Sequence, residues 1–185
     1  DITAYKLVDD ALRMSEERYL AVFENSGTAN AIFDLNFQLV MHNSMSQKIL
    51  NAKGPGDFIG RKVEYIFGPE KASLIKERML RISKTGITEE FETEHDLPVG
   101  KKWFHTAYLP LFNEKQDIIG IQTISRDITE QKQMQETLRK NENLFRGIFD
   151  QAAVGAAQID SNTGRFLRIN QKYCDIVGYS PEEME

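Results

Sequence analysis

The residues best suited to chemistry in this chain are three histidines, one cysteine and a run of acidic side chains. His42, His95 and His105 fall on expected strands or at a strand end, where a lone histidine is typically a surface or capped residue. Cys174 has no supporting Ser-His-Asp or Cys-His grouping, so we interpret it as a packing residue. Strand alternation divides the acidic run between two faces, which favours a solvated sheet edge over a metal site; the run comprises Glu89, Glu90, Glu92, Glu94 and Asp96. The sequence therefore predicts no catalytic residue and no metal ligand.

The amino-acid composition indicates which kinds of partner this chain is suited to bind. A hydrophobic share of 41% and a charged share of 28% are ordinary for a soluble globular protein, and the net charge of −5 offers no basic footprint for nucleic acid or anionic lipid. No apolar run approaches the roughly 20 residues that a membrane-spanning helix needs. One cysteine excludes an intramolecular disulfide framework and fits a reducing compartment. We therefore expect a cytoplasmic segment without nucleic-acid or membrane contacts of its own.

The chain also repeats itself. When its first residues are laid on the triplet Asp127-Ile128-Thr129, matches continue through the following helix, and one inserted residue extends them further. The aligned pairs include Asp1-Ile2-Thr3 with Asp127-Ile128-Thr129, Phe23 with Phe149, and Asn43 with Asn170. The second copy stops at Glu185, near the position that corresponds to Gly56 to Gly60. We expect tandem domain-sized copies, the second of which is cut short.

Both copies open with an amphipathic helix whose apolar positions step by three and four. The stripe is narrow, as in a coiled-coil seam, and the opposite faces are charged. Ser15 and Asn141 share one heptad position, where a polar residue fixes register at some cost in stability. The pattern predicts a parallel homodimer, and the alternative is that each helix packs on its own domain. The seam comprises Tyr5, Val8, Leu12, Ser15, Tyr19 and Val22, then Gln131, Met134, Leu138, Asn141, Phe145 and Ile148.

A mixed pattern of strands and helices lies between these two helices. Two short apolar runs, 31–35 and 37–42, predict a hairpin, and Asn43-Ser44 would cap a short helix through Leu50. A longer helix is expected over 69–84, with Gly86 as its stop and Leu74, Ile75, Met79, Leu80 and Ile82 on its apolar side. Strands are expected over 87–95, 102–112 and 118–127. This order predicts an α+β fold, a five-stranded antiparallel sheet with helices on one face.

Several motifs, held in order, resemble the PAS family over essentially the whole chain. They are Asn43 after the hairpin, Phe58-Ile59-Gly60-Arg61 before the long helix, Trp103 with Pro110, Gly120 leading into Asp127-Ile128-Thr129, and the segment Gly178-Tyr179-Ser180-Pro181-Glu182-Glu183. The resemblance implies a PAS-like sheet flanked by coiled-coil-type helices. The expected limits are a linker helix at 1–22, a complete PAS domain at 23–129, a signalling helix at 130–148 and the first part of a second PAS domain at 149–185.

The resemblance also suggests a ligand pocket. Alternation puts Ile121, Thr123 and Ser125 on one side of the last strand, and by resemblance to flavin-binding PAS domains that side faces the pocket. A mostly apolar cavity dotted with hydroxyls suits a small organic ligand, whereas a filled core without ligand is the alternative. The pocket candidates are Leu39, Met41, Ile66, Phe67, Leu74, Phe91, Phe104, Thr106, Tyr108, Ile121, Thr123 and Ser125.

No particular cofactor is required by these residues. Light-sensing members that form a cysteinyl-flavin adduct need a Gly-x-Asn-Cys-Arg-Phe stretch before the long helix, and residues 51–56 contain no cysteine. Members that bind haem commonly take an axial histidine from the helical region, and residues 69–84 contain none. We therefore expect neither the adduct nor haem, while non-covalent flavin remains open.

Asp127-Ile128-Thr129 is the expected point of signal transmission. In the family, a ligand or partner perturbs the sheet and the change passes into the helix that follows it. Here the last strand runs into that helix without a flexible Gly/Ser spacer, so a distorted sheet would move the helix. Asp127 and Thr129 are also expected to satisfy free donors at the helix start, and capping without any switching role is the alternative.

The resulting prediction is a sensory module that acts on an output domain outside this chain, in a bacterial or archaeal sensor histidine kinase. By family habit, that output domain would carry the enzyme activity, because these residues contain no phosphoacceptor histidine motif and no nucleotide-binding glycine motif. Two alternatives stay open. One is a cofactor-carrying redox or ligand receptor, and the other is a structural dimerisation spacer.

Overall fold

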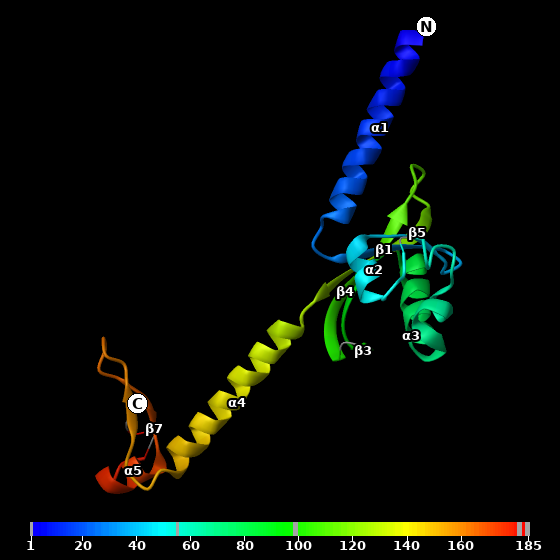
Figure 1. Cartoon of the computed structure of the whole chain (residues 1–185). Helices are drawn as coiled ribbons and strands as arrows, with labels where there is room; N and C mark the ends of the chain where they lie inside the picture. The colour runs from blue at the N-terminus through cyan, green and yellow to red at the C-terminus, as the bar shows by residue number, and fades with distance from the viewer. Residues whose placement is uncertain (1, 55, 98–99, 181–182, 184–185) are drawn as a thin grey trace. The chain divides into compact units, whose positions relative to one another are not determined.

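A computed structural model describes residues 2–54, 56–97, 100–180 and 183, without the side chains of residues 2–5. The chain divides into two compact units, Asp1–Thr129 and Glu130–Glu185. The helices and strands, coloured by position in Figure 1, are α1 (Ile2–Glu24), β1 (Ala29–Asp34), β2 (Leu39–His42), α2 (Ser44–Ile49), α3 (Val63–Thr85), β3 (Glu89–Leu97), β4 (Gly100–Phe112), β5 (Ile118–Asp127), α4 (Thr129–Gln151), β6 (Ala157–Ile159), β7 (Phe166–Ile169) and α5 (Gln171–Val177).

The first unit is built on a five-stranded sheet in the order β2-β1-β5-β4-β3, and every neighbouring pair is antiparallel. This confirms the predicted fold. On β4 the buried residues alternate as Phe104, Thr106 and Tyr108, which is the period of a strand with one face toward the core. The register sets Thr106 opposite Ser125, and Tyr108 opposite Thr123. The acidic strand β3 lies at the sheet edge, as its charge pattern predicted.

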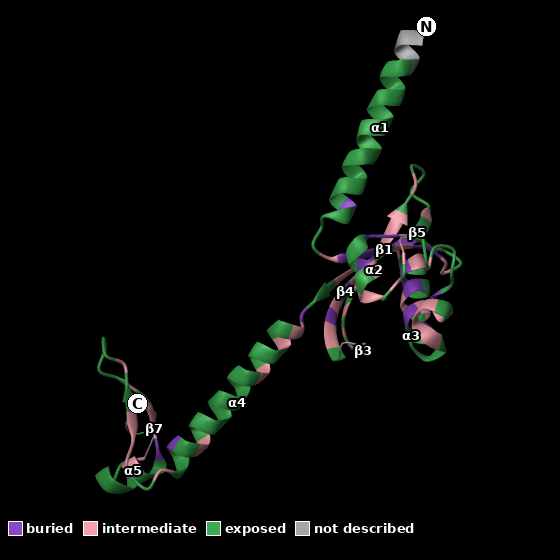
Figure 2. Ribbon diagram, in the orientation of Figure 1, coloured by how far each residue is buried: buried purple, intermediate pink, exposed green. Residues whose placement is uncertain are grey.

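Helix α3 covers the inner face of this sheet. Its buried residues Ile75, Met79 and Ile82 follow the spacing of one helical face and form one core with Phe33 and Ile121 of the sheet. Leu74 and Leu80, predicted for the same apolar side, are instead each 45% exposed because they lie off that narrow stripe. Figure 2 shows the buried residues gathered on the side of α3 that faces the strands.

The predicted helix over 69–84 forms, but α3 begins earlier. Residues from Val63 make a first helical segment, and Gly68 then interrupts the helix with a φ of 76°, a conformation that favours glycine. Pro69 opens the second segment, where the missing N–H of proline costs no hydrogen bond. Gly86 ends the helix in the left-handed conformation, as predicted, and donates its N–H to the carbonyl of Ile82.

Strand limits differ from the prediction by one or two residues at several ends, and the starts of β2 and β3 are two examples. Phe37 was expected to begin a strand, but it adopts a φ of 61° in a turn, where the Asp34 carboxylate accepts the N–H groups of Asn36 and Gln38. Ile87 was expected in the third strand, but that strand begins at Glu89 and leaves the Ile87 side chain 64% exposed. A polar contact precedes each start, since the Thr85 hydroxyl also accepts the N–H of Ile87 at 3.3 Å before β3.

A buried asparagine joins helix α1 to the first hairpin. The side-chain amide of Asn43 donates to the carbonyls of Phe23, at the end of α1, and of Thr28. Its side-chain oxygen accepts the N–H groups of Asn30 and Ser46, so it also caps α2 as predicted. All of its hydrogen-bonding capacity is used while the side chain is only 1% exposed.

The second unit contains the same arrangement. Asn170 is fully buried, donates to the carbonyls of Phe149 and Val154, and accepts the N–H groups of Ala156 and Tyr173. We call each arrangement an asparagine clamp, formed around Asn43 and around Asn170. The sequence repeat is therefore also a repeat of hydrogen bonds. In the same unit Cys174 is buried and unpaired, in agreement with its predicted packing role.

The predicted seam residues of α1 and α4 face solvent, as the exposed colour along both helices in Figure 2 illustrates. Ser15, Gln131 and Asn141 are also exposed. The side chain of Tyr5, predicted for the same seam, lies outside the described residues. The exposed apolar members are Val8, Leu12, Tyr19, Val22, Met134, Leu138, Phe145 and Ile148. In the described part of the chain these helices do not bury this stripe on their own units.

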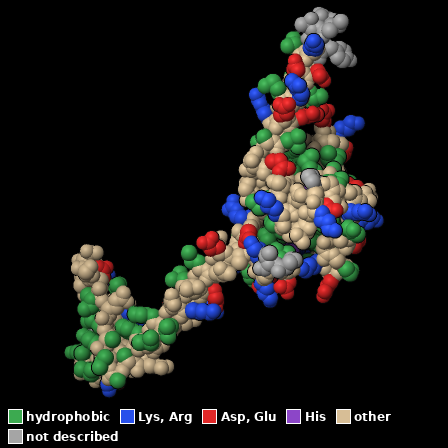
Figure 3. Space-filling model, viewed as in Figure 1, with side chains coloured by type: hydrophobic (Ala, Val, Ile, Leu, Met, Phe, Trp, Pro, Cys, Tyr) green, Lys and Arg blue, Asp and Glu red, His purple; other side chains and the backbone are tan. Residues whose placement is uncertain are grey.

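Acidic and basic side chains are interspersed over the face of the first unit that Figure 3 shows. Many belong to exposed ion pairs, such as Arg81 with Glu89 and Lys101 with Glu94. Among the helices of the described residues, none is both long enough and apolar enough to span a bilayer.

Candidate functional site

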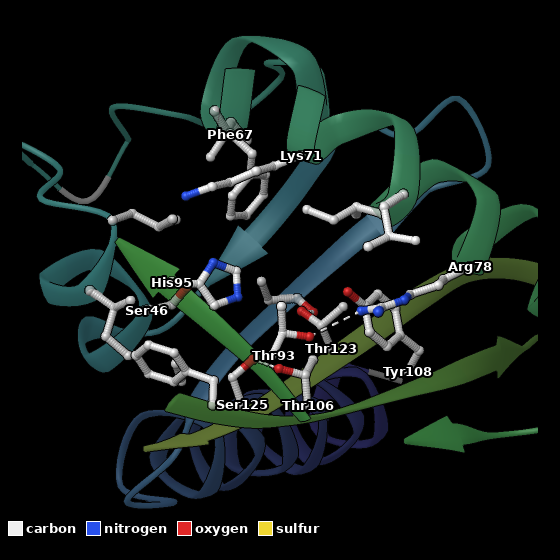
Figure 4. A pocket seen from close by; sticks show the side chains of 18 of the residues that line it. Ser46, Phe67, Lys71, Arg78, Thr93, His95, Thr106, Tyr108, Thr123 and Ser125 are labelled. Atoms are coloured by element: carbon white, nitrogen blue, oxygen red, sulfur yellow. Dashed lines mark hydrogen bonds between the residues drawn. The ribbon is translucent and has the colours of Figure 1, made fainter. Parts of the chain in front are cut away.

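A cavity of about 440 Å³ lies in the first unit between helices α2 and α3 and the inner face of the sheet. This volume falls in the range of small-molecule sites in proteins. Side chains from all five strands except β2 line it, together with residues from both helices (Figure 4). The core between α3 and the sheet is therefore incompletely filled at this end.

The structure brings together eight of the twelve residues predicted for the pocket. The strand residues Thr106, Tyr108, Thr123 and Ser125 point into the cavity from adjacent strands, as Figure 4 shows. Their role as ligand contacts stays a prediction. The eight residues that line the cavity are Ile66, Phe67, Leu74, Phe104, Thr106, Tyr108, Thr123 and Ser125.

The other four predicted residues do not line the cavity. Leu39 and Ile121 are almost completely buried in the packed core, and Phe91 packs against that core from β3. Met41 lies on β2, whose register with β1 shifts between Ile32 and Phe33. The extra residue of such a bulge reverses which face of the sheet the following side chains occupy. A simple period-two count along the sequence does not include this reversal.

Hydroxyl groups form a polar strip along the floor of the cavity. The hydroxyls of Thr106 and Ser125 lie 2.9 Å apart across β4 and β5. Thr123 donates to the carbonyl of Ala31 at 3.4 Å. Burial raises the pKa of Tyr108, an effect that its contact with Arg78 only partly offsets, so its hydroxyl stays protonated at neutral pH.

Sequence reasoning missed the basic side chains of this cavity. Lys71 and Arg78 come from α3, two helical turns apart, and His95 comes from β3 (Figure 4). His95 follows Phe91 and Thr93 in the alternation of β3, a signal in the sequence that assigns it to the inner face. Lys71 and Arg78 gave no such signal, because a basic residue on a helix is usually solvated.

Arg78 is the best-defined of these basic groups. Its guanidinium lies 3.8 Å from the ring centroid of Phe91, and its Nη1 donates to the Thr93 hydroxyl at 3.5 Å. It also interacts with the hydroxyl of Tyr108. All these partners are neutral, and among the described residues no carboxylate lies within ion-pair distance of Arg78 or Lys71.

His95 is adjacent to this positive charge. Burial lowers the pKa of His95, and the charges of Lys71 and Arg78 lower it further. Its ring packs edge-on against Phe104 at 5.6 Å between centroids. The imidazole is therefore held neutral, with ring nitrogens able to donate or accept a hydrogen bond.

The other two histidines are placed differently. His105 lies on the opposite face of β4, where its Nε2 is 3.1 Å from the Glu90 carboxylate. His42 was interpreted as a surface or capped residue, but it is only 8% exposed at the end of β2. Its Nδ1 lies 3.3 Å from the carbonyl of Asn43, and its Nε2 has no partner among the described residues.

The junction between β5 and α4 is tied to strand β4. Ile128 is buried and donates its N–H to the carbonyl of Trp103 at 2.8 Å, while the Trp103 N–H donates to the Thr129 hydroxyl at 3.0 Å. Burial alone would raise the pKa of Asp127, but hydrogen bonds from Lys102 and Thr129 bring it below its usual value. The residues of the predicted transmission triplet therefore form one bonded joint.

One detail of this joint differs from the prediction. Asp127 accepts the N–H of Thr129, the first residue of α4, as expected for a residue that satisfies free donors at a helix start. The Thr129 hydroxyl was expected to act in the same way, but it accepts from Trp103 on β4 and donates to Asp127. The threonine therefore binds the helix to the sheet.

Comparison with known proteins identifies relatives over the whole chain. A family model described as PAS fold matches residues 23–133, and one described as PAS domain matches residues 143–185. Sporulation kinase A of Bacillus subtilis is 29% identical over 195 residues, which cover 96% of this chain and 30% of the kinase. Two-component sensor PprA of Pseudomonas aeruginosa is 28% identical over 140 residues, covering 75% of this chain and 15% of the sensor. The chain therefore spans less than a third of either relative.

Solved structures agree on the fold. The PAS domain of an HTR-like protein from Haloarcula marismortui matches with a TM-score of 0.53 at 21% identity, covering 66% of this chain and 99% of that domain. A PAS domain from Colwellia psychrerythraea matches with a TM-score of 0.52 at 19% identity, covering 62% and 97%. Because the PAS fold match also extends over more than half of the residues, we conclude that this chain belongs to the PAS family.

Proposed function

We propose that this chain is the sensory PAS region of a two-component sensor histidine kinase. The curated relatives that it matches are sensors and histidine kinases, and it corresponds to 30% or less of the two described above. The kinase activity of the parent protein would reside in an output domain outside these residues. A cytoplasmic location is part of the proposal, since the buried, unpaired Cys174 fits a reducing compartment.

The proposal assigns a role to each segment. Residues 23–129 form the sensing domain, and residues 130–148 form the helix that transmits the signal. Residues 1–22 form an amphipathic linker helix, and residues 149–185 begin a second PAS domain. A family match from residue 23 to residue 133 supports the limits of the first domain. The cavity inside it favours a small-molecule ligand over a purely structural spacer.

The joint at Asp127, Ile128 and Thr129 is the single observation that carries the transmission role. Ser125 lines the cavity on β5, two residues before Asp127, and its neighbour across the sheet, Thr106, also lines it. A change at the cavity that displaces the end of β5 would act directly on the first turn of α4 through the bonded joint. The conformational step is a small shift of a packed element, the type of change that interfaces amplify.

Amide hydrogen exchange of the 185-residue chain tests this role. Ser125→Leu fills part of the cavity and removes the hydroxyl contact with Thr106, so we expect altered exchange rates at residues 130–137. Adding Thr129→Val removes the acceptor for the Trp103 N–H, so the effect of Ser125→Leu on α4 should disappear. Identical rates in Ser125→Leu and the wild type would contradict transmission.

A matched control uses a serine of α3 that lies outside the cavity lining. Ser83 bonds only to the carbonyl of Leu80 among the described contacts and does not line the cavity. Ser83→Leu adds the same side chain without touching the pocket, so the exchange of residues 130–137 should stay at the wild-type rate. A change of equal size in this control would assign the effect to general destabilisation.

A further inference from the structure

We propose that the cavity binds a small organic carboxylate with an apolar body. This inference deepens the proposed sensory function, on which it rests, by assigning a chemical class to the ligand. It depends on one juxtaposition in Figure 4: a guanidinium, an ammonium and an imidazole line a cavity whose other walls are mainly apolar or bear hydroxyls. The lining also includes the carboxylates of Glu94 and Asp96 and the amide of Asn51.

The charge of the cavity is the first step. Arg78 is half-buried and stacks on Phe91, and its two hydrogen-bonding neighbours, Thr93 and Tyr108, are both neutral. A guanidinium carries five N–H donors, so two neutral hydroxyls leave both its charge and some of its donors unmatched. Partial removal of a charge from water is unfavourable without an opposite charge, so the half-buried guanidinium favours an anion as the occupant of the cavity.

Two acidic residues at the cavity edge do not supply that anion. Glu94 and Asp96 flank His95 on β3 and belong to the cavity lining, but both side chains are exposed to solvent. Glu94 is also paired with Lys101 at 3.4 Å. Among the described residues, no carboxylate therefore lies within ion-pair distance of Arg78 or Lys71, and the Glu89 carboxylate acts on Arg78 only through its charge from farther away.

The geometry of Arg78 favours a carboxylate. A planar guanidinium matches the two oxygens of a carboxylate in a bidentate pair, and its stacking on Phe91 fixes the plane of the fork. Lys71 adds a second positive charge from the same helix face. The neutral imidazole of His95 supplies one more hydrogen-bonding group beside them.

The other walls specify the rest of the ligand. Phe67, Leu74 and Phe104 present apolar surface, and the Thr106 and Ser125 hydroxyls already bond to each other. A fully hydrated inorganic anion would leave this apolar surface in contact with water. An aryl or branched alkyl group buries it, which adds favourable free energy in proportion to the area covered.

Isothermal titration of the whole 185-residue chain tests the ligand class with defined probes. The probes are benzoate, phenylacetate and indole-3-acetate, each compared with its carboxamide, which has the same shape without the charge, and with inorganic phosphate. We expect at least one carboxylate to bind roughly tenfold more tightly than its amide and than phosphate. Absence of binding by all three carboxylates, or equal binding of amide or phosphate, would overturn the proposal.

Variants connect the affinity to the named residues. Arg78→Gln should weaken carboxylate binding at least roughly tenfold, Lys71→Gln should weaken it less, and Lys84→Gln, an exposed lysine in the last turn of the same helix, should leave it unchanged. If Arg78→Gln does not fold, Arg78→Lys keeps the charge without the fork and should retain only part of the affinity. Wild-type affinity in a folded variant of Arg78 overturns the proposal.

These outcomes separate the ligand class from the signalling role. Carboxylate binding with no response in helix α4 leaves the ligand class standing and contradicts transmission. A response of α4 to Ser125→Leu, together with no carboxylate binding, contradicts the ligand class alone.

Discussion

At the residue scale, the cavity holds a histidine whose surroundings all favour its neutral form. Its partial burial and the charges of Lys71 and Arg78 lower the pKa of His95, and its ring packs against Phe104 of β4. Glu94 and Asp96 on its own strand are exposed at the cavity edge. A polar group buried beside like charges is more typical of a binding site than of a core optimised for stability. The cluster was invisible to motif reasoning because its members are separated in the sequence.

This placement predicts a pH dependence of stability. The folded-state pKa of His95 is below its ordinary value of about 6.5, so the unfolded chain binds a proton that the folded chain resists. Stability should therefore be complete above about pH 6.5 and fall as the pH drops through the lowered pKa. Thermal unfolding of the unliganded chain between about pH 7.5 and 5 measures it.

The test variant for this prediction is His95→Asn. Its thermal stability should decline less steeply than that of the wild type as the pH falls below about 6.5. His105→Asn, on the outer face beside Glu90, leaves the contribution of His95 in place and should keep the steeper decline. Wild-type steepness in His95→Asn would assign the decline to other groups.

At the element scale, the asparagine clamps join helices to the hairpins that follow them. Asn43→Ala would leave the carbonyls of Phe23 and Thr28 and the N–H groups of Asn30 and Ser46 without their buried partner. We expect a loss of about 2–4 kcal/mol in the free energy of unfolding, measured by urea denaturation, because unmatched buried polar groups are costly.

A matched asparagine gives the reference value. Asn36 lies in the exposed turn between β1 and β2, where its side chain makes one long contact with Asp34. Asn36→Ala should change stability by no more than about 0.5 kcal/mol, as is usual for surface substitutions. Equal effects in the two variants would show that the Asn43 hydrogen bonds add nothing to stability.

The inner and outer faces of a strand were predictable wherever residue alternation along that strand was enough to assign them. The alternation of Phe104, Thr106 and Tyr108 assigned an inner face correctly because both neighbours of β4 are regular over that stretch. Met41 was misplaced because the bulge on β2, where Val40 is the extra residue, depends on pairing, which no local period encodes. Arg78 was missed for a related reason: only its stack on Phe91, thirteen residues away in the chain, makes its position in the cavity evident.

At the scale of the whole molecule, the exposed seams on α1 and α4 predict a homodimer. Leu12 and Leu138 are 57% and 68% exposed, and each lies in an apolar stripe with heptad-like spacing. A second copy of the chain would bury these stripes, in agreement with the parallel arrangement that the repeat suggests. The polar Ser15 and Asn141 would then meet their own equivalents and set the register.

Leu138→Asp tests the dimer, because a charge at a seam position opposes association. We expect the dissociation constant, measured by sedimentation equilibrium, to rise at least roughly tenfold over the wild type. Gln133→Asp adds the same charge at an exposed position of α4 that does not flank the seam, and should leave association unchanged. A wild-type chain that stays monomeric at high concentration would contradict the seam.

Helix α4 is held by side-chain hydrogen bonds at both of its ends. Thr129 accepts from Trp103 at the start, and the carbonyl of Phe149 accepts from Asn170 near the finish. The number of residues between these two attachments therefore also sets the angle between them around the helix axis. One inserted residue would turn the second attachment by about 100° about the helix axis, whereas seven would return it to within about 20°. Natural variation in the length of this connector should accordingly occur in steps of whole heptads.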